Sequence, residues 1–230
     1  MADAQMPDPV LQSALDICEA AQTEIVQSNK RLADAATNTI NSGVPHEIAV
    51  SPAHGQFLAL LCRAINAKNV LEIGVLGGFS TIWFAESLPG IHVTGIEYDA
   101  KHHKVATENT KGLGNVELLL GAALDVLPRL AEQNRVFDFV FIDAAWEEQA
   151  QYFDWAVKMT RKGGIIYVDN SVRQLTESSE EERRPGAPAV ALIEHVKADK
   201  RVTATLIPTL NTHKKELLEV VDGFLFAVVQ

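Results

Sequence analysis

The stretch VLEIGVLGGFST, residues Val70–Thr81, places a continuous apolar strand directly before a glycine-rich turn. Glycine allows tight turning and a close approach of ligand to backbone, and a helix that begins after such a turn offers free N–H groups to an anion. Open parallel sheets bind ligands in the crevice beyond the carboxyl ends of their strands. The stretch therefore predicts a ligand-binding turn in an α/β fold.

The rest of the chain fits this fold. From Asn69 onward, short apolar runs alternate with helical segments, which is typical of a mostly parallel sheet with helices on both faces. The predicted strands are Val70–Gly74, His92–Tyr98, Val116–Gly121, Phe137–Asp143, Gly164–Asp169, Val202–Pro208 and Gly223–Val229. The apolar spacing before them predicts helices at Pro9–Ala36 and Pro52–Ile65. We expect one domain over residues 1–230, with residues 1–50 as a helical addition and residues 51–230 as the α/β core.

Composition limits the partners and the location of the protein. The 230 residues carry a net charge of −10 without a cluster of Lys and Arg, which argues against a nucleic-acid surface. The N-terminus has no apolar core typical of a signal peptide, and no apolar run is long enough to span a membrane. Cys18 and Cys62 lie in helix-like apolar patterns and are predicted to be buried thiols in a reducing compartment. We expect a cytoplasmic protein.

The ends of the first three strands predict a nucleoside pocket. The second strand ends with Glu97, whose carboxylate can accept both hydroxyl protons of a ribose. After the third strand, Ala122 and Ala123 leave room for a flat ring. The glycine order after the first strand is GxxGG with Glu72 at the strand end, and not the GxGxxG of dinucleotide sites. This order counts against NAD, and an NAD-dependent oxidoreductase is kept as the less favoured alternative.

Oxygen-bearing side chains follow the next two strands. The fourth strand ends with Asp143, and the fifth with Asp169 and Asn170. If these strands are neighbours, the three side chains converge on one edge, where they suit a hard divalent cation such as Mg²⁺. For either aspartate alone, capping of a helix is the favoured interpretation. The three together favour a metal site.

Four segments carry a family resemblance: GQFLALLCRAINAKNVLEIGVLGGFST, GIEYD, FIDAA and YVDN. They resemble the cation-dependent, S-adenosylmethionine-dependent O-methyltransferases, the family of the caffeoyl-CoA and catechol enzymes, from about residue 51 to the end. The resemblance implies a class I methyltransferase (Rossmann-like) fold, a homodimer, and S-adenosylmethionine with Mg²⁺, or with Mn²⁺ or Ca²⁺, as cofactors. The residues that it implies at the cofactor are Glu72, Gly74, Ser80, Glu97, Ala123, Asp143 and Tyr152. The metal ligands that it implies are Asp143, Asp169 and Asn170.

The chain departs from the family at one catalytic position. Three residues after Asp143 the family usually has a lysine, taken as the general base, and this chain has Trp146. Trp146 is either a core aromatic or a wall for a planar substrate. The closing KELLEVVDGFLFAVV is similar to the end of the catechol enzymes, which implies that Glu216 lies beside the substrate hydroxyls and acts in catalysis with Asp143 and Trp146. His54 is a further candidate for contacting the cofactor or serving as a base.

The resemblance implies a reaction and a class of substrate. The enzyme would methylate one hydroxyl of a vicinal aromatic diol, such as a catechol, a flavonoid or a caffeoyl-type molecule. Its partner would be this small phenolic substrate, with no nucleic acid or membrane involved. The missing lysine keeps open a non-catalytic binding protein derived from a methyltransferase.

Overall fold

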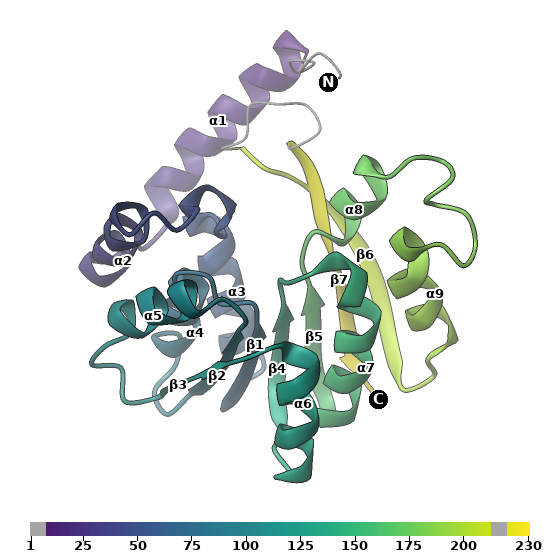
Figure 1. Ribbon diagram of the computed structural model, residues 1–230. Helices are drawn as coiled ribbons and strands as arrows, with labels where there is room; N and C mark the ends of the chain where they lie inside the picture. The colour runs from purple at the N-terminus through teal and green to yellow at the C-terminus, as the bar shows by residue number, and fades with distance from the viewer. Residues whose placement is uncertain (1–7, 213–219) are drawn as a thin grey trace.

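The computed structural model describes residues 8–212 and 220–230, which form a twisted sheet flanked by helices (Figure 1). The strands are β1 (Asn69–Ile73), β2 (His92–Glu97), β3 (Val116–Leu120), β4 (Phe137–Ile142), β5 (Thr160–Val168), β6 (Val202–Leu210) and β7 (Val221–Val229). The helices in this part of the chain are α1 (Pro9–Ile25), α2 (Lys30–Asn41), α3 (Pro52–Ala64), α4 (Phe79–Ala85), α5 (Ala100–Asn109), α6 (Ala123–Glu132), α7 (Gln149–Met159), α8 (Ser171–Glu177) and α9 (Ala191–Ala198). Short 3₁₀ turns occupy η1 (His46–Ile48), η2 (Trp146–Glu148) and η3 (Pro188–Val190).

The order of the strands brings the predicted ligand-binding turns together. The sheet runs β3-β2-β1-β4-β5-β7-β6, with β1 to β5 parallel and β7 antiparallel to both of its neighbours. The strand order reverses between β1 and β4, so the crevice beyond their carboxyl ends lies at the switch point of the sheet. Because β7 is antiparallel, its amino end lies at this same edge. The seven predicted strands and the mostly parallel α/β fold are confirmed.

Two apolar layers hold the centre of the sheet. All six residues of β4, FDFVFI, are buried, as expected for a strand covered on both faces. Val140 and Ile142 pack with residues of α6, α7 and α9. Phe139 and Phe141 face the opposite side and pack with residues of α3 and α4. This alternation fixes the register of β4, and thereby fixes which side chains follow it at the carboxyl edge.

The predicted helix Pro9–Ala36 is wrong as a single element. The structure has two helices, α1 and α2, with extended backbone between them, and α2 continues to Asn41. The break has a local cause at Asn29, whose side chain accepts a hydrogen bond from the backbone N–H of Leu32 at 3.0 Å. An asparagine that caps a helix in this way competes with continuation of the preceding one. The period of apolar residues does not record such a cap.

The two cysteines differ in their exposure. Cys62 is buried in α3, as predicted, and burial raises the pKa of its thiol to about 12. Cys18 is exposed, so its predicted burial is wrong. The reason is the position of α1, which projects from the body of the molecule and has only Leu15 as a buried residue in the structure described (Figure 1).

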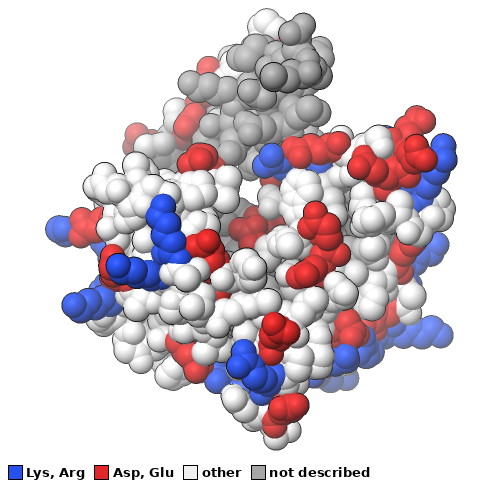
Figure 2. Space-filling model, in the orientation of Figure 1, with Lys and Arg blue, Asp and Glu red and all other residues white. Residues whose placement is uncertain are grey.

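Two further features concern the expectation that neither nucleic acid nor a membrane is a partner. Figure 2 shows acidic and basic side chains interspersed on one face, without a continuous basic patch on that face. Within residues 8–212 and 220–230, the structure has no helix with the length and apolar character needed to cross a membrane.

Candidate active site

A pocket of about 1110 Å³ lies at the carboxyl edge of the sheet. It is lined by residues that follow β1, β2, β3, β4 and β5, by the start of β7, and by parts of α3 and η1. Figure 2 shows the face that is hollowed here, with acidic side chains in and around the hollow. The pocket therefore contains the edge of the sheet at which the sequence predicts both a nucleoside and a metal.

The turn after β1 is built around a buried carboxyl group. The side chain of Glu72 accepts hydrogen bonds from Ser80 Oγ and Thr81 Oγ1, each at 2.5 Å, which tie β1 to α4. Burial raises the pKa of Glu72 to about 8, and the two hydroxyl donors oppose that rise. Gly74, at φ +92°, lies in the left-handed region that favours glycine. Of the predicted cofactor residues at this turn, Gly74 and Ser80 line the pocket, whereas Glu72 is fully buried and is not among the lining residues.

Glu97 is held in place by backbone donors. Its Oε2 accepts from the N–H groups of Val75 and Leu76, at 3.0 and 2.8 Å, and its Oε1 accepts from Asp99 N–H at 2.9 Å. His102 also lines the pocket, with Nδ1 3.7 Å from Glu97 Oε1. A carboxylate has about four acceptor positions, so capacity remains for an added donor. This arrangement suits hydroxyl donors such as those of a ribose.

Three acidic side chains form what we call the acidic cluster: Asp143 after β4, Asp169 after β5 and Asp222 in β7. Asp169 and Asp222 are 7% and 5% exposed, and all three line the pocket. Burial, followed by the charges of Asp169 and Asp222, raises the pKa of Asp143 well above its usual value. Burial and the charge of Asp222 raise the pKa of Asp169 to about 7. The cluster is therefore a site of concentrated negative potential.

The cluster has the chemistry of a cation site. In the described part of the chain, none of the ion pairs formed by Lys or Arg includes any of the three acids. Within that part, no three Asp, Glu, His or Cys side chains are arranged to hold a metal by themselves. The predicted ligand set of Asp143, Asp169 and Asn170 contains two carboxylates and one amide, which are oxygen donors of the kind that Mg²⁺ accepts. The donor set fits a divalent cation.

The alternative that the aspartates cap helices is not supported by their contacts. Asn170, at φ +54°, is the residue before α8, and Ala145 is the residue before η2. Neither of these helix starts has a side-chain cap hydrogen bond. Asp143 and Asp169 each lie one or two residues before these positions. Helix capping therefore does not explain why both carboxyl groups line the pocket.

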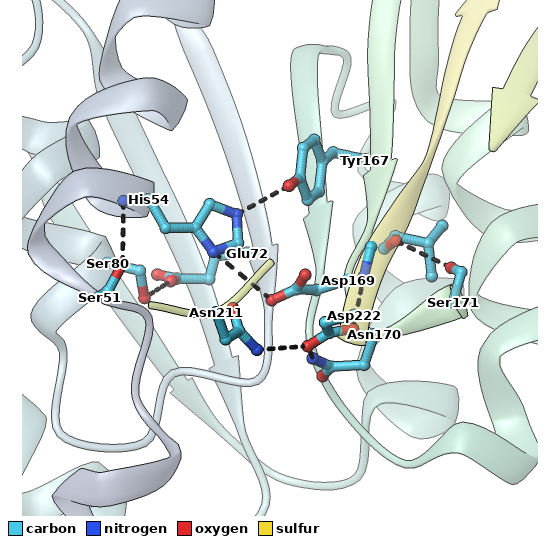
Figure 3. A network of polar contacts seen from close by, with 12 residues as sticks. Ser51, His54, Glu72, Ser80, Tyr167, Asp169, Asn170, Ser171, Asn211 and Asp222 are labelled. Atoms are coloured by element: carbon cyan, nitrogen blue, oxygen red, sulfur yellow. Dashed lines mark hydrogen bonds and ion pairs between the residues drawn. The ribbon is translucent and has the colours of Figure 1, made fainter. Parts of the chain in front are cut away.

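His54 lies beside the acidic cluster, at the first turn of α3. Its Nε2 is 2.7 Å from the hydroxyl of Tyr167, and its Nδ1 is 3.9 Å from Asp169 Oδ2 (Figure 3). Burial lowers the pKa of His54 to about 4, with the charge of Asp222 opposing the change, so the ring is neutral near pH 7. A tyrosine hydroxyl that donates to Nε2 leaves the proton of neutral His54 on Nδ1. In that tautomer the proton on Nδ1 faces Asp169 Oδ2, 3.9 Å away.

The other predicted site residues are also found at the pocket, with one exception. Trp146, Tyr152 and Ala123 line it. Trp146 is half-buried at the start of η2 and forms part of the pocket wall, and its placement excludes a fully buried core position. The hydroxyl of Tyr152 donates to Glu148, and burial raises the pKa of that hydroxyl. Glu216 lies outside the described residues, so its role stays a prediction.

Asp222 and the contact between His54 and Tyr167 were not predicted from the sequence. Asp222 directly precedes the predicted strand Gly223–Val229. An antiparallel strand would bring its first residue to the carboxyl edge of the parallel strands, which is the signal that could have indicated it. Tyr167 is within β5 and carries no such signal.

The fold is that of a class I methyltransferase. A model of the O-methyltransferase family matches residues 22–212. A catechol O-methyltransferase of Niastella koreensis is 39% identical over 206 residues, covering 85% of this chain and 89% of the relative. One of Mycobacterium tuberculosis is 36% identical over 230 residues, covering 98% of both chains. The structure of an O-methyltransferase from Bacillus cereus, in complex with SAH, is 32% identical, with a TM-score of 0.84 over 95% of this chain and 100% of that one.

The chain belongs to the O-methyltransferase family. The predictions of this family, of an enzyme that transfers methyl groups to oxygen and of its fold are therefore confirmed.

Proposed function

We propose that the protein transfers the methyl group of S-adenosylmethionine to one hydroxyl of a vicinal aromatic diol, and that the transfer depends on a divalent cation. The observation that carries this proposal is the acidic cluster, which lies in the same pocket as the turn around Glu72. The relatives named catechol O-methyltransferase, and the Bacillus cereus structure with SAH, support the same choice of substrate and donor. The homodimer and the cytoplasmic location expected from the sequence stay predictions.

The cofactor would be held by the residues after the first three strands. Glu97 would accept the ribose hydroxyls, and the buried Glu72 would support the turn that receives the methionine end. The small side chains Ala122 and Ala123 line the pocket where a flat adenine needs space. Hydrogen bonds already fix both glutamates, so little ordering would be needed on binding.

Asp143, Asp169 and Asn170 would hold the cation. When bound there, a divalent cation lowers the pKa of a hydroxyl that coordinates it. The walls of the pocket, Trp146 among them, would hold the aromatic ring so that its oxygen lies in line with the methyl carbon and the sulfur. Such positioning is the main protein contribution to a displacement reaction.

The proton acceptor is the point at which this chain departs from the usual pattern of the family that it resembles. No lysine is among the pocket-lining residues that the structure describes. The only described His beside the cluster, His54, has Nε2 bonded to Tyr167. We propose that acidification of the substrate hydroxyl takes over most of the work of a base, with Glu216 or bulk water receiving the proton.

The proposal is tested by assaying methyl transfer to catechol with S-adenosylmethionine, first with added Mg²⁺ and then with excess EDTA. We expect product with Mg²⁺, loss of product in EDTA, and recovery when Mg²⁺ is restored in excess. NAD in place of S-adenosylmethionine is expected to bind undetectably by calorimetry. Full activity in EDTA would refute the cation requirement, and binding of S-adenosylmethionine without turnover of any diol would favour a binding protein.

Trp146 should act as a wall for the substrate ring. In Trp146→Ala we expect KM for catechol to rise about 2-fold to 10-fold, because an aromatic pair contributes about 0.5–1.5 kcal/mol beyond its buried area. The affinity for S-adenosylmethionine should change less. Trp146→Phe is the matched control and should keep most of the affinity. Equal KM values for the parent and the alanine variant would show that the side chain does not contact the substrate.

A further inference from the structure

Asp222 is a buried carboxylate that collects two side-chain amides. Its Oδ2 accepts from Asn170 Nδ2 at 3.0 Å and from Asn211 Nδ2 at 3.1 Å (Figure 3). Its Oδ1 accepts from the backbone N–H of Gly223 at 2.7 Å. The residue is 5% exposed. Asp222 therefore joins the start of β7, the end of β6 and the residue that precedes α8.

The contact with Asn170 constrains which end of its amide a ligand can use. A side-chain amide has a donor end and an acceptor end, and a cation requires the acceptor end. The nitrogen of Asn170 is occupied by Asp222, and rotation of the amide by half a turn would place its oxygen against the carboxylate. That rotated state has two acceptors in contact and no hydrogen bond, which is costly for a buried pair.

The backbone gives a second constraint on the same residue. Asn170 adopts a left-handed conformation, at φ +54° and ψ 15°, at the junction of β5 and α8. Asparagine is one of the few non-glycine residues that adopt this conformation readily. The backbone oxygen of Asn170 accepts from Gln174 N–H at 2.8 Å, and its side chain is bonded to Asp222. Hydrogen bonds with Gln174 and Asp222, neither of which is a predicted cation ligand, thus fix both the main chain and the side chain of Asn170.

We propose that Asp222 is a positioning residue for the cation site, which fixes the amide of Asn170 so that its oxygen is the end available to a divalent cation. This inference rests on the proposed cation dependence and adds a residue to it. Three N–H groups occupy most of the acceptor positions of the Asp222 carboxylate, which favours an orienting role over coordination of the cation. Groups that hydrogen-bond to metal ligands and orient them commonly affect affinity as strongly as some ligands do.

The experiment is a double-mutant cycle on cation binding, with Mn²⁺ as the probe, followed by electron paramagnetic resonance without substrate or cofactor. We expect Asp222→Ala to weaken Mn²⁺ binding about 10-fold to 100-fold, the range found for residues that orient metal ligands. In the Asn170→Ala background, the same change should weaken binding less than about 3-fold, because there is no amide left to orient. Asp222→Asn keeps an acceptor for Asn170 and should recover part of the affinity.

Two other outcomes would contradict either the proposed function or the positioning role of Asp222. If the parent protein binds no Mn²⁺, the proposed function itself fails. If the parent binds Mn²⁺ and Asp222→Ala has the same effect in both backgrounds, Asp222 acts through its charge or as a ligand, and the positioning role is refuted.

Asp138→Asn is the matched control. Asp138 is also buried and accepts from Lys68 and Asn69 N–H, but it lies at the amino end of β4, at the edge of the sheet opposite to the pocket. It should leave Mn²⁺ affinity unchanged. Should Asp222→Ala fail to fold, Asp222→Asn and Asn211→Ala keep the test open, since loss of Asn211 removes one amide and should spare Mn²⁺ binding.

Discussion

Replacing Asp169 with alanine is expected to lower kcat/KM for catechol methylation at least about 1000-fold, because a bound cation contributes several kcal/mol to stabilising developing charge. Asp169 is buried at the pocket, and the charge of Asp222 together with burial raises its pKa to about 7. Such a carboxyl group is costly to keep in a fold without a positive partner. The measurement is steady-state methyl transfer with saturating Mg²⁺.

The binding of S-adenosylmethionine gives the comparison that separates the two halves of the pocket. Calorimetry on Asp169→Ala should show that cofactor affinity changes far less than turnover, because Glu72 and Glu97 lie on other strands. Asp138→Asn serves again as a buried acid away from the pocket, and it should lose stability while keeping kcat. An Asp169→Ala enzyme with parental kcat/KM would contradict a catalytic metal at this position.

Much of the site could be predicted because, in a parallel sheet, the functional residues lie at the end of each strand or directly after it in the sequence. Glu97, Asp143 and Asp169 each follow or end a short apolar run, and neighbouring parallel strands present such residues at one edge. The glycine-rich turn after β1 is visible in the same way. A single strand with its following turn thus carries enough information to place one side chain at the crevice.

Asp222 and the partners of His54 could not be predicted by the same reasoning. Asp222 reaches the site only because β7 inserts antiparallel between β5 and β6, and strand order is a property of the whole sheet. The contact of His54 with Tyr167 depends on how α3 packs on β5, which periodicity does not encode. The prediction of one continuous helix over residues 9–36 fails for the opposite reason, because the single capping side chain of Asn29 overrides a regular apolar pattern.

The second large effect is expected at the cofactor turn, in Gly74→Ala. A Cβ atom added at Gly74 would lie 2.0 Å from the backbone oxygen of Asp143, and the glycine has φ +92°. The change therefore combines backbone strain with a clash against main chain that a side-chain rotation cannot relieve. We expect an unfolding free energy lower by at least about 3 kcal/mol, since left-handed strain and overpacking each cost about 1–3 kcal/mol. Thermal and urea unfolding would measure it.

Gly112→Ala separates the effect of backbone strain from the effect on the site. Gly112 has a similar φ, +87°, but an added Cβ there meets no atom within 4 Å, so this variant carries the backbone strain alone. The excess loss in Gly74→Ala is then the cost of pushing Asp143 away from β1. Because Asp143 is both a predicted cation ligand and a neighbour of the cofactor, Gly74→Ala should weaken Mn²⁺ and S-adenosylmethionine binding together, whereas Gly112→Ala should weaken neither. Equal stability and equal binding in the two variants would show that the turn can shift without moving Asp143, and the close contact between β1 and β4 would then have no part in assembling the site.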